Sequence, residues 1–237
     1  MTARPVLVLV HGTRFDGRQW QGYDALVPGA DVVLVDLPGH GTRTGEAYTT
    51  DAAVAVVAEA IDAAPPGAPI VLAGHSLGGY VATTYAERHP GRLAALVVIG
   101  ACADPTRHRL LRRLYSGFAA ALPVVGPARM SGVMNRVLRA LGADPALLPD
   151  ETAYAVLPAA WAATAAGAGA HQMRSLQHPV FLVAGQFDQL GIDIRRYARA
   201  CRDPHVRIIP RATHLAPLTH RSQVAAVLTD AAALARD

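Results

Sequence analysis

The chain has 237 residues, 51% of them hydrophobic, and a formal net charge of +4 at neutral pH. This length and apolar fraction exclude a disordered chain and indicate one large domain, or a domain with an insertion. All 22 basic residues are arginine, and the absence of lysine excludes lysine Schiff bases, pyridoxal phosphate attachment and the Walker-type phosphate-binding lysine. Two cysteines, Cys102 and Cys201, are too few for a disulfide framework.

Several classes of segment and site are missing from the sequence. No apolar run approaches ~18 residues, so we expect no membrane span. The run at residues 6–10 is too short for a signal peptide, and we therefore expect a cytoplasmic protein. The spacings typical of zinc ligands and of nucleic-acid-binding motifs do not occur, so we expect no metal, no cofactor and no nucleic-acid partner.

Strand and helix patterns alternate along the chain. The apolar run at 5–10 predicts a buried parallel strand, followed by a short helix around 20–26. Further strands are predicted at 31–35, 70–73, 93–99, 180–184 and 206–209, and further helices at 51–63, 77–89 and about 222–235. This alternation predicts an α/β fold with a mainly parallel sheet and helices on both faces. In such sheets, ligands bind beyond the carboxyl ends of the strands.

About 80 residues without a strand pattern separate the fourth and fifth strands. Helical patterns lie near 107–122, 129–141 and 150–166, and in the first of them apolar residues recur every four positions with arginines opposite. We interpret residues 102–175 as a helical lid inserted into a core formed by 1–101 and 176–237. A rigid helical layer that does not move is the alternative. The candidate pocket residues are Leu110, Leu114, Phe118, Leu141 and Trp161, and the lid arginines, Arg112 and Arg113 among them, could favour substrates with an acidic group.

The sequence Gly74-His75-Ser76-Leu77-Gly78 lies between the third strand and the helix after it. A serine in a sharp strand-to-helix turn points out of the sheet into a cleft, and glycines on either side allow the two elements to approach closely. The free N–H groups at the start of the helix point toward the same cleft. Ser76 is therefore the candidate nucleophile, and the Leu77 N–H is a candidate donor to an oxyanion.

A serine hydroxyl needs a base within hydrogen-bond reach, usually a histidine held by a carboxylate. Among ten histidines, His214 follows the sixth strand and is the candidate base. Asp188 follows the fifth strand and is the candidate acid, with Asp104 and Asp193 as rivals. The loop after the first strand offers a second oxyanion donor, the Thr13 N–H.

These stretches together resemble the α/β-hydrolase superfamily, in its lid-bearing, esterase-like branch. The matching stretches are Val10-His11-Gly12-Thr13 with Trp20 downstream, Asp36-Leu37-Pro38-Gly39-His40-Gly41, the Ser76 turn, Gly185-Gln186-Phe187-Asp188, and His214 with its flanks. The resemblance implies Ser76, Asp188 and His214 as the triad. Family members usually begin with two further strands, so we expect a trimmed three-layer fold of about six strands, with the edge at 31–35 open to pairing or covered by a partner.

The expected activity is hydrolysis of a carboxylic ester or related acyl bond in a small-molecule substrate, through an acyl-enzyme on Ser76. Two alternatives remain open at this point. The same fold hosts lyases and cofactor-free oxygenases or perhydrolases that use the same side chains. A ligand-binding protein with little turnover is the third reading.

Overall fold

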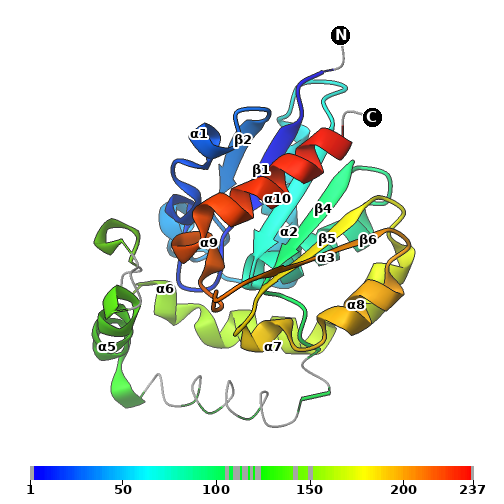
Figure 1. Cartoon of the computed structure of the whole chain (residues 1–237). Coiled ribbons are helices and arrows are strands. Elements are labelled where there is room, and N and C mark those ends of the chain that lie inside the picture. The colour runs from blue at the N-terminus through cyan, green and yellow to red at the C-terminus, as the bar shows by residue number, and fades with distance from the viewer. Residues whose placement is uncertain are drawn as a thin grey trace.

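The computed structural model describes residues 3–104, 107–108, 113, 117, 120, 124–140, 144–148 and 152–235. Six parallel strands form one sheet in the order β2–β1–β3–β4–β5–β6, which confirms the predicted fold class (Figure 1). The strands are β1 (Val6–Val10), β2 (Asp31–Val35), β3 (Ile70–His75), β4 (Ala95–Ile99), β5 (Val180–Gly185) and β6 (Pro204–Ile209). The strand order reverses at β1, so a crevice is expected at the carboxyl ends of β1 and β3.

The α-helices connect these strands and cover the sheet. They are α1 (Tyr23–Leu26), α2 (Thr50–Asp62), α3 (Leu77–Arg88), α5 (Pro127–Ala140), α6 (Thr152–Ala155), α7 (Leu157–Gly167), α8 (Ile194–Ala200), α9 (Ala216–Thr219) and α10 (Arg221–Leu234). Short 3₁₀ segments are η1 (Gly17–Trp20), η2 (Gly41–Arg43), η3 (Pro145–Leu147), η4 (Ala170–Ser175) and η5 (Gln189–Gly191). Within the described residues, none of the helices combines the length and the apolar character that crossing a bilayer requires.

The core has two halves because side chains alternate between the faces of a strand. In β1, Val6, Val8 and Val10 face the layer of α2, α3 and α8. Leu7 and Leu9 face the opposite layer, formed by α10 and by the region of α1. Both halves are sealed from water, since all five β1 side chains are at most 2% exposed. The sheet therefore lies between two helical layers, with α10 in front of it in Figure 1.

One local prediction is wrong in detail. The expected helix at 20–26 is instead a 3₁₀ turn, η1, followed by α1, because Gly22 adopts a left-handed conformation (φ 80°) between them. His220, the residue before α10, makes no side-chain capping bond, and its Nδ1 lies 2.9 Å from Thr219 Oγ1. Thr49 caps α2, because its side chain accepts the Ala52 N–H.

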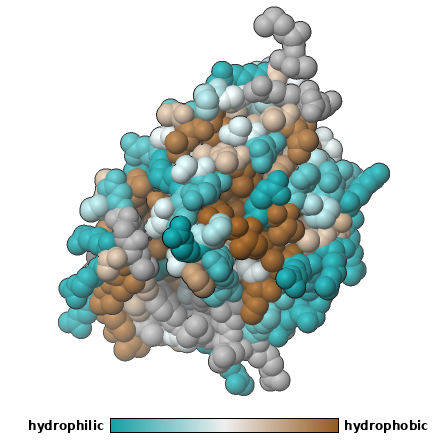
Figure 2. Space-filling view, in the orientation of Figure 1, coloured by the Kyte–Doolittle hydropathy of each residue, from teal (hydrophilic) through white to brown (hydrophobic). Residues whose placement is uncertain are grey.

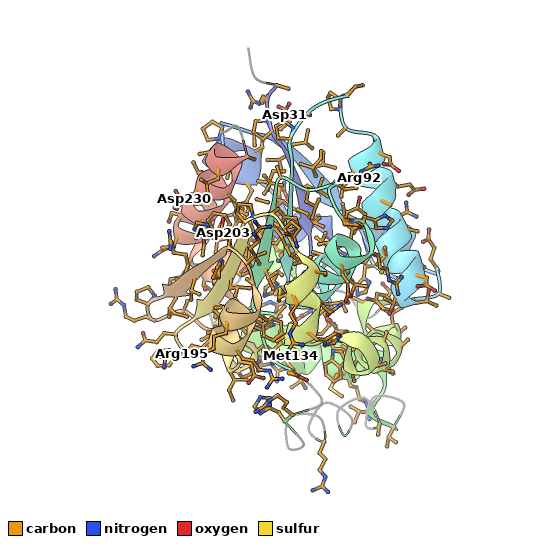
Figure 3. The ribbon with its side chains drawn as sticks, turned by 90° about the vertical axis from the view of Figure 1, so that its right-hand side faces the viewer. Asp31, Arg92, Met134, Arg195, Asp203 and Asp230 are labelled. Atoms are coloured by element: carbon orange, nitrogen blue, oxygen red, sulfur yellow. The ribbon has the colours of Figure 1, made fainter. Side chains whose placement is uncertain are left out.

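The segment between β4 and β5 has two described parts that pack differently. Helix α7 and η4 pack against α3, and their residues Ala160 and Met173 belong to the main core. Helix α5 instead packs on loops at the carboxyl ends of the strands. Met134 of α5, labelled in Figure 3, lies at the opposite end of the molecule from Asp31, the first residue of β2. Of the predicted pocket residues, Leu110, Leu114, Phe118 and Leu141 lie outside the described residues, as does Arg112.

Candidate active site

The turn between β3 and α3 holds Ser76 in a strained conformation. Its φ of 53° lies in the left-handed region, which costs a non-glycine residue about 1–3 kcal/mol. The turn is also tight, since a Cβ added to Gly74 would lie 2.1 Å from the Gly78 carbonyl oxygen, and one added to Gly78 would lie 2.5 Å from the His11 carbonyl oxygen. The predicted elbow is present, and its two glycines are required by the close approach of strand and helix.

Three side chains from distant parts of the chain meet at this turn. His214 Nε2 lies 3.0 Å from Ser76 Oγ, and His214 Nδ1 lies 2.9 Å from Asp188 Oδ1. The Asp188 side chain is 2% exposed and that of His214 is 18% exposed. The structure therefore brings together the three residues that the sequence analysis selected, in hydrogen-bond contact with one another.

Asp188 is held as a carboxylate on the far side of the imidazole. Burial by itself raises the pKa of this carboxyl group, but the hydrogen bond and charge of His214, with the Leu190 N–H at 2.8 Å, bring the pKa below its ordinary value. Gly100 packs against this pair, because a Cβ added to it would lie 2.8 Å from Asp188 Oδ2 and 3.0 Å from His214 Nδ1. Because the ionised carboxylate accepts a hydrogen bond from Nδ1, the proton of a neutral His214 lies on Nδ1. Nε2 is then available to accept from the serine hydroxyl.

Two backbone N–H groups beside Ser76 are free to bind an anion. Among the described residues, neither the Leu77 N–H nor the Thr13 N–H donates to a protein acceptor. Leu77 opens α3 directly after Ser76, so its N–H is one of the unpaired donors at a helix start. The Thr13 loop approaches from the other side, where a Cβ added to Gly12 would lie 3.3 Å from Ser76 Cβ.

Gln19 and His75 join the loops that surround the site, and no sequence pattern singled out Gln19. Gln19 Oε1 accepts the Gly12 N–H at 2.9 Å, and its Nε2 lies 3.2 Å from His75 Nδ1. His75 Nε2 in turn lies 2.9 Å from the His214 carbonyl oxygen, and the two imidazole rings are 4.8 Å apart. Burial, with a smaller effect of His214, lowers the pKa of His75 to about 3, so His75 is neutral and donates from Nε2.

A second buried histidine fixes the first strand to the loop after β2. His11 Nε2 accepts the Leu37 N–H at 3.0 Å, and Nδ1 donates to the Gly12 carbonyl oxygen at 2.9 Å. Burial and the neighbouring His40 lower the pKa of His11 to about 4, so it is neutral near pH 7. Asp36 closes this loop by accepting the N–H groups of Gly17 and Thr42.

The rival carboxylates make other contacts. Asp193 Oδ2 accepts the Asp104 N–H at 2.9 Å and lies 2.7 Å from His108 Nε2. Asp104 and Asp193 thus belong to a network beyond β4, while Asp188 is the carboxylate that is hydrogen-bonded to His214. The order of the strands decides this, because β5 lies beside β6, whose following loop carries His214.

Helix α5 packs on the loops that carry Phe15 and Leu215, beside the Ser76 turn. Its Leu138 forms a buried cluster with Phe15 and Leu215, and Met134 packs against the same cluster. Phe15 follows the Thr13 loop by two residues, and Leu215 directly follows His214. The outer side of α5 carries the exposed Val133 and Val137, and Figure 2 shows apolar residues in this part of the surface.

Trp161 is the one predicted pocket residue that the structure describes. It packs, partly buried, against a small cluster centred on Tyr154 and Leu157, which Met130 and Met134 of α5 also contact. Trp161, in α7, thus shares a cluster with two methionines of α5.

A family model described as "Alpha/beta hydrolase family" matches residues 7–227. A pimeloyl-[acyl-carrier protein] methyl ester esterase of Xanthomonas campestris pv. campestris (strain B100) is 30% identical over 248 residues, covering 94% of this chain and 93% of that protein. Lipase LipV of Mycobacterium tuberculosis (strain H37Rv) is 38% identical over 97 residues, covering 40% of this chain and 37% of the lipase. The chain spans less than two thirds of the length of several of the curated relatives that it matches.

Among solved structures, a thermophilic esterase from Thermogutta terrifontis superposes with a TM-score of 0.77 at 22% identity, covering 100% of this chain and 92% of that one. This likeness concerns the fold, which includes the parallel sheet and both helical layers. The family model spans β1 to α10 and contains the Ser76 turn, Asp188 and His214. The chain therefore belongs to the alpha/beta hydrolase family, as its sequence motifs predict.

Proposed function

We propose that this protein hydrolyses carboxylic esters through an acyl-enzyme formed on Ser76. The observation that carries the proposal is the continuous contact from Ser76 Oγ to His214 and on to Asp188, at 3.0 Å and 2.9 Å. A hydroxyl at this distance from an imidazole nitrogen is within the range required for proton transfer to a general base.

In the proposed reaction, His214 Nε2 takes the Ser76 proton as Oγ attacks the ester carbonyl carbon. The imidazolium that forms is stabilised by Asp188, whose lowered pKa keeps it ionised at neutral pH. His214 then gives the proton to the departing alcohol as the C–O bond breaks. A water molecule repeats the sequence on the acyl-enzyme, with His214 again acting as base, and releases the acid.

The negative charge of each tetrahedral intermediate falls on the former carbonyl oxygen. We assign the N–H groups of Leu77 and Thr13 as its donors, because both are without a protein acceptor and lie on opposite sides of Ser76. Removing one such donor in a serine hydrolase costs about 10²–10³ in turnover. The strain at Ser76 and the anchoring of the Thr13 loop by Gln19 hold these groups in place before substrate arrives.

The named activities of relatives support an ester substrate. The relative from Xanthomonas campestris that aligns over most of both chains is a methyl ester esterase, and the Mycobacterium tuberculosis relative is a lipase. Both names describe cleavage of a carboxylic ester. We extend the chemical class, a carboxylic ester, to this chain, with a small molecule as the simplest substrate.

We further propose that the segment 102–175 is a lid on the core formed by 1–101 and 176–237. The support comes from α5, which packs on Phe15 and Leu215 at the site mouth rather than on the sheet. Movement of α5 would break that small cluster and the contacts of Met130 and Met134 with the Tyr154 cluster. It would leave the main core intact, because α7 and η4 pack separately against α3. In this proposal, the arrangement with α5 on Phe15 and Leu215 is the covered state of the site.

The test is turnover of a panel of 4-nitrophenyl and methyl esters of graded chain length by the wild type and Ser76→Ala. We expect Ser76→Ala to lose ~10³-fold or more in kcat/KM on any ester that the wild type hydrolyses. Reaction in isotopically labelled water separates hydrolysis from other chemistry of this fold, because hydrolysis places one solvent oxygen in the acid. Full activity in Ser76→Ala, or no solvent oxygen in the product, rejects the proposal.

A further inference from the structure

Arg14 is a cation beside the site without a carboxylate partner. Among the described residues, its guanidinium makes no hydrogen bond and no ion pair, and it lies 5.9 Å from the centre of the Tyr154 ring. Arg14 is half-buried and directly follows Thr13. A partly desolvated guanidinium without a counter-ion is unfavourable, because its charge has lost water and gained no partner.

The position of Arg14 ties it to the reacting group. Consecutive Cα atoms are about 3.8 Å apart, so Arg14 Cα lies within about 7.6 Å of Gly12 Cα. Gly12 is the residue whose added Cβ would lie 3.3 Å from Ser76 Cβ. Arg14 also adopts a left-handed conformation with φ of 72°, which is unusual for an arginine, so the loop holds it at this point against a backbone preference.

Tyr154 provides a second, independent observation at the same place. It is 0% exposed, and its hydroxyl has no hydrogen-bond partner among the described residues. Buried hydroxyl groups in folded proteins are nearly always paired, so an unpaired one needs an explanation. Tyr154 comes from the segment between β4 and β5 and Arg14 from the loop after β1, and the guanidinium carbon lies over the Tyr154 ring at 5.9 Å from its centre.

The other arginines near the lid differ from Arg14. Arg113, Arg129, Arg136 and Arg139 are all exposed, and exposed charges bind weakly because water and salt screen them. A carboxylate bound to Arg14 would lie beside the buried Tyr154, where a charge-assisted hydrogen bond is strong.

We propose that Arg14, assisted by the Tyr154 hydroxyl, binds a carboxylate on the acyl chain of the ester substrate, so that the preferred substrates are half-esters of dicarboxylic acids. This assignment rests on the proposed hydrolysis at Ser76 and names its substrate class. The ester carbonyl sits between Thr13 and Leu77, and the free carboxylate sits one residue further along the same loop. The acidic-group preference then originates in the core loop and not in the exposed lid arginines.

The experiment compares three pairs of methyl esters that differ only in a terminal carboxylate. The half-esters of succinate, glutarate and adipate are measured against the methyl esters of butyrate, valerate and hexanoate. The readout is the ratio of kcat/KM within a pair. Bonds to charged groups lead us to expect a ratio of ~10 or more for the best-fitting half-ester in the wild type.

The variants separate charge, hydroxyl and backbone effects. We expect Arg14→Gln to lower the ratio ~10-fold or more, Arg14→Lys to lie between it and the wild type, and Tyr154→Phe to lower the ratio about threefold. Arg211→Gln is the matched control, since Arg211 is exposed and also has a left-handed φ, of 58°; its ratio should equal that of the wild type. Arg14→Asn serves as the second neutral variant if Arg14→Gln does not fold, because asparagine tolerates a positive φ.

A binding measurement keeps this assignment separate from the reaction itself. Ser76→Ala is titrated calorimetrically with the best half-ester, alone and combined with Arg14→Gln, and we expect the second change to weaken Kd ~10-fold. If neutral esters are hydrolysed through Ser76 but the ratio is unaffected by Arg14, the carboxylate site is wrong and the hydrolase stands. If no ester is hydrolysed but half-ester binding depends on Arg14, the site stands and the hydrolysis does not; if neither occurs, both are overturned.

Discussion

Replacing Gly100 by alanine should separate Asp188 from His214 although neither of these two residues is substituted. Gly100 follows β4 with φ of 57°, and its N–H donates to the Val183 carbonyl oxygen at 2.8 Å. The new Cβ would lie 2.8 Å from Asp188 Oδ2 and 3.0 Å from His214 Nδ1. Both distances are shorter than ordinary van der Waals contacts. Neither side chain can swing away freely, because the two are hydrogen-bonded to each other at 2.9 Å.

Two costs follow from the change, and they fall on different measurements. An alanine in the left-handed region costs about 1–2 kcal/mol of unfolding free energy. Displacing the imidazole from the serine affects the rate, and a shift of ~1 Å in a reacting group costs about 10² in turnover. We therefore expect Gly100→Ala to lose stability modestly and kcat by about two orders of magnitude.

Gly91→Ala is the matched control for the backbone term. Gly91 has φ of 78°, and a Cβ added there meets nothing within 4 Å. The two variants should lose similar stability in urea unfolding, while only Gly100→Ala loses kcat on a responsive ester. Equal kcat in the two variants would show that the Asp188–His214 contact is insensitive to crowding, and the geometric reasoning about this pair would be refuted.

Two further predictions concern the buried polar groups. Gln19→Leu removes the partners of the Gly12 N–H and of His75 Nδ1, and each buried group left unpaired costs about 1–3 kcal/mol. We therefore expect this variant to have lower stability and a lower kcat. Gln21→Leu, an exposed change in the same loop, should alter neither. Equal kcat in the two leucine variants would remove Gln19 from the set of positioning residues. The second prediction concerns pH. The pKa of His11 is lowered from 6.5 to about 4, so its contribution to the unfolding free energy is complete above pH 6.5 and is lost as the pH falls toward 4. This pKa difference corresponds to about 3 kcal/mol. The pKa values of His75 and Asp188 are lowered as well, and both contributions are also lost in acid. Urea midpoints that stay constant between neutral pH and about pH 4.5 would contradict the assignment of neutral buried histidines.

The Ser76 turn could be predicted from sequence because its cause is local. A buried strand, a tight corner and a helix must fit within a few residues, and only glycine satisfies the contacts at positions 74 and 78. Asp188 and His214 could be predicted because parallel strands place their carboxyl ends at one edge of the sheet, which favours His214, in the loop directly after β6, among the ten histidines. In both cases a short-range pattern or a rule of topology carries the information.

Gln19, Gly100 and Tyr154 could not be selected in this way. Each one is significant only through a partner distant in the chain: Gln19 through His75, Gly100 through the Asp188–His214 pair, and Tyr154 through Arg14. The sequence by itself determined the order of the strands and main helices and the three side chains that meet at the Ser76 turn, because periodicity and turn chemistry act over a few residues. Tertiary structure alone decided which buried groups support those side chains and which cation is left without a partner, because desolvation and hydrogen bonding depend on neighbours in space.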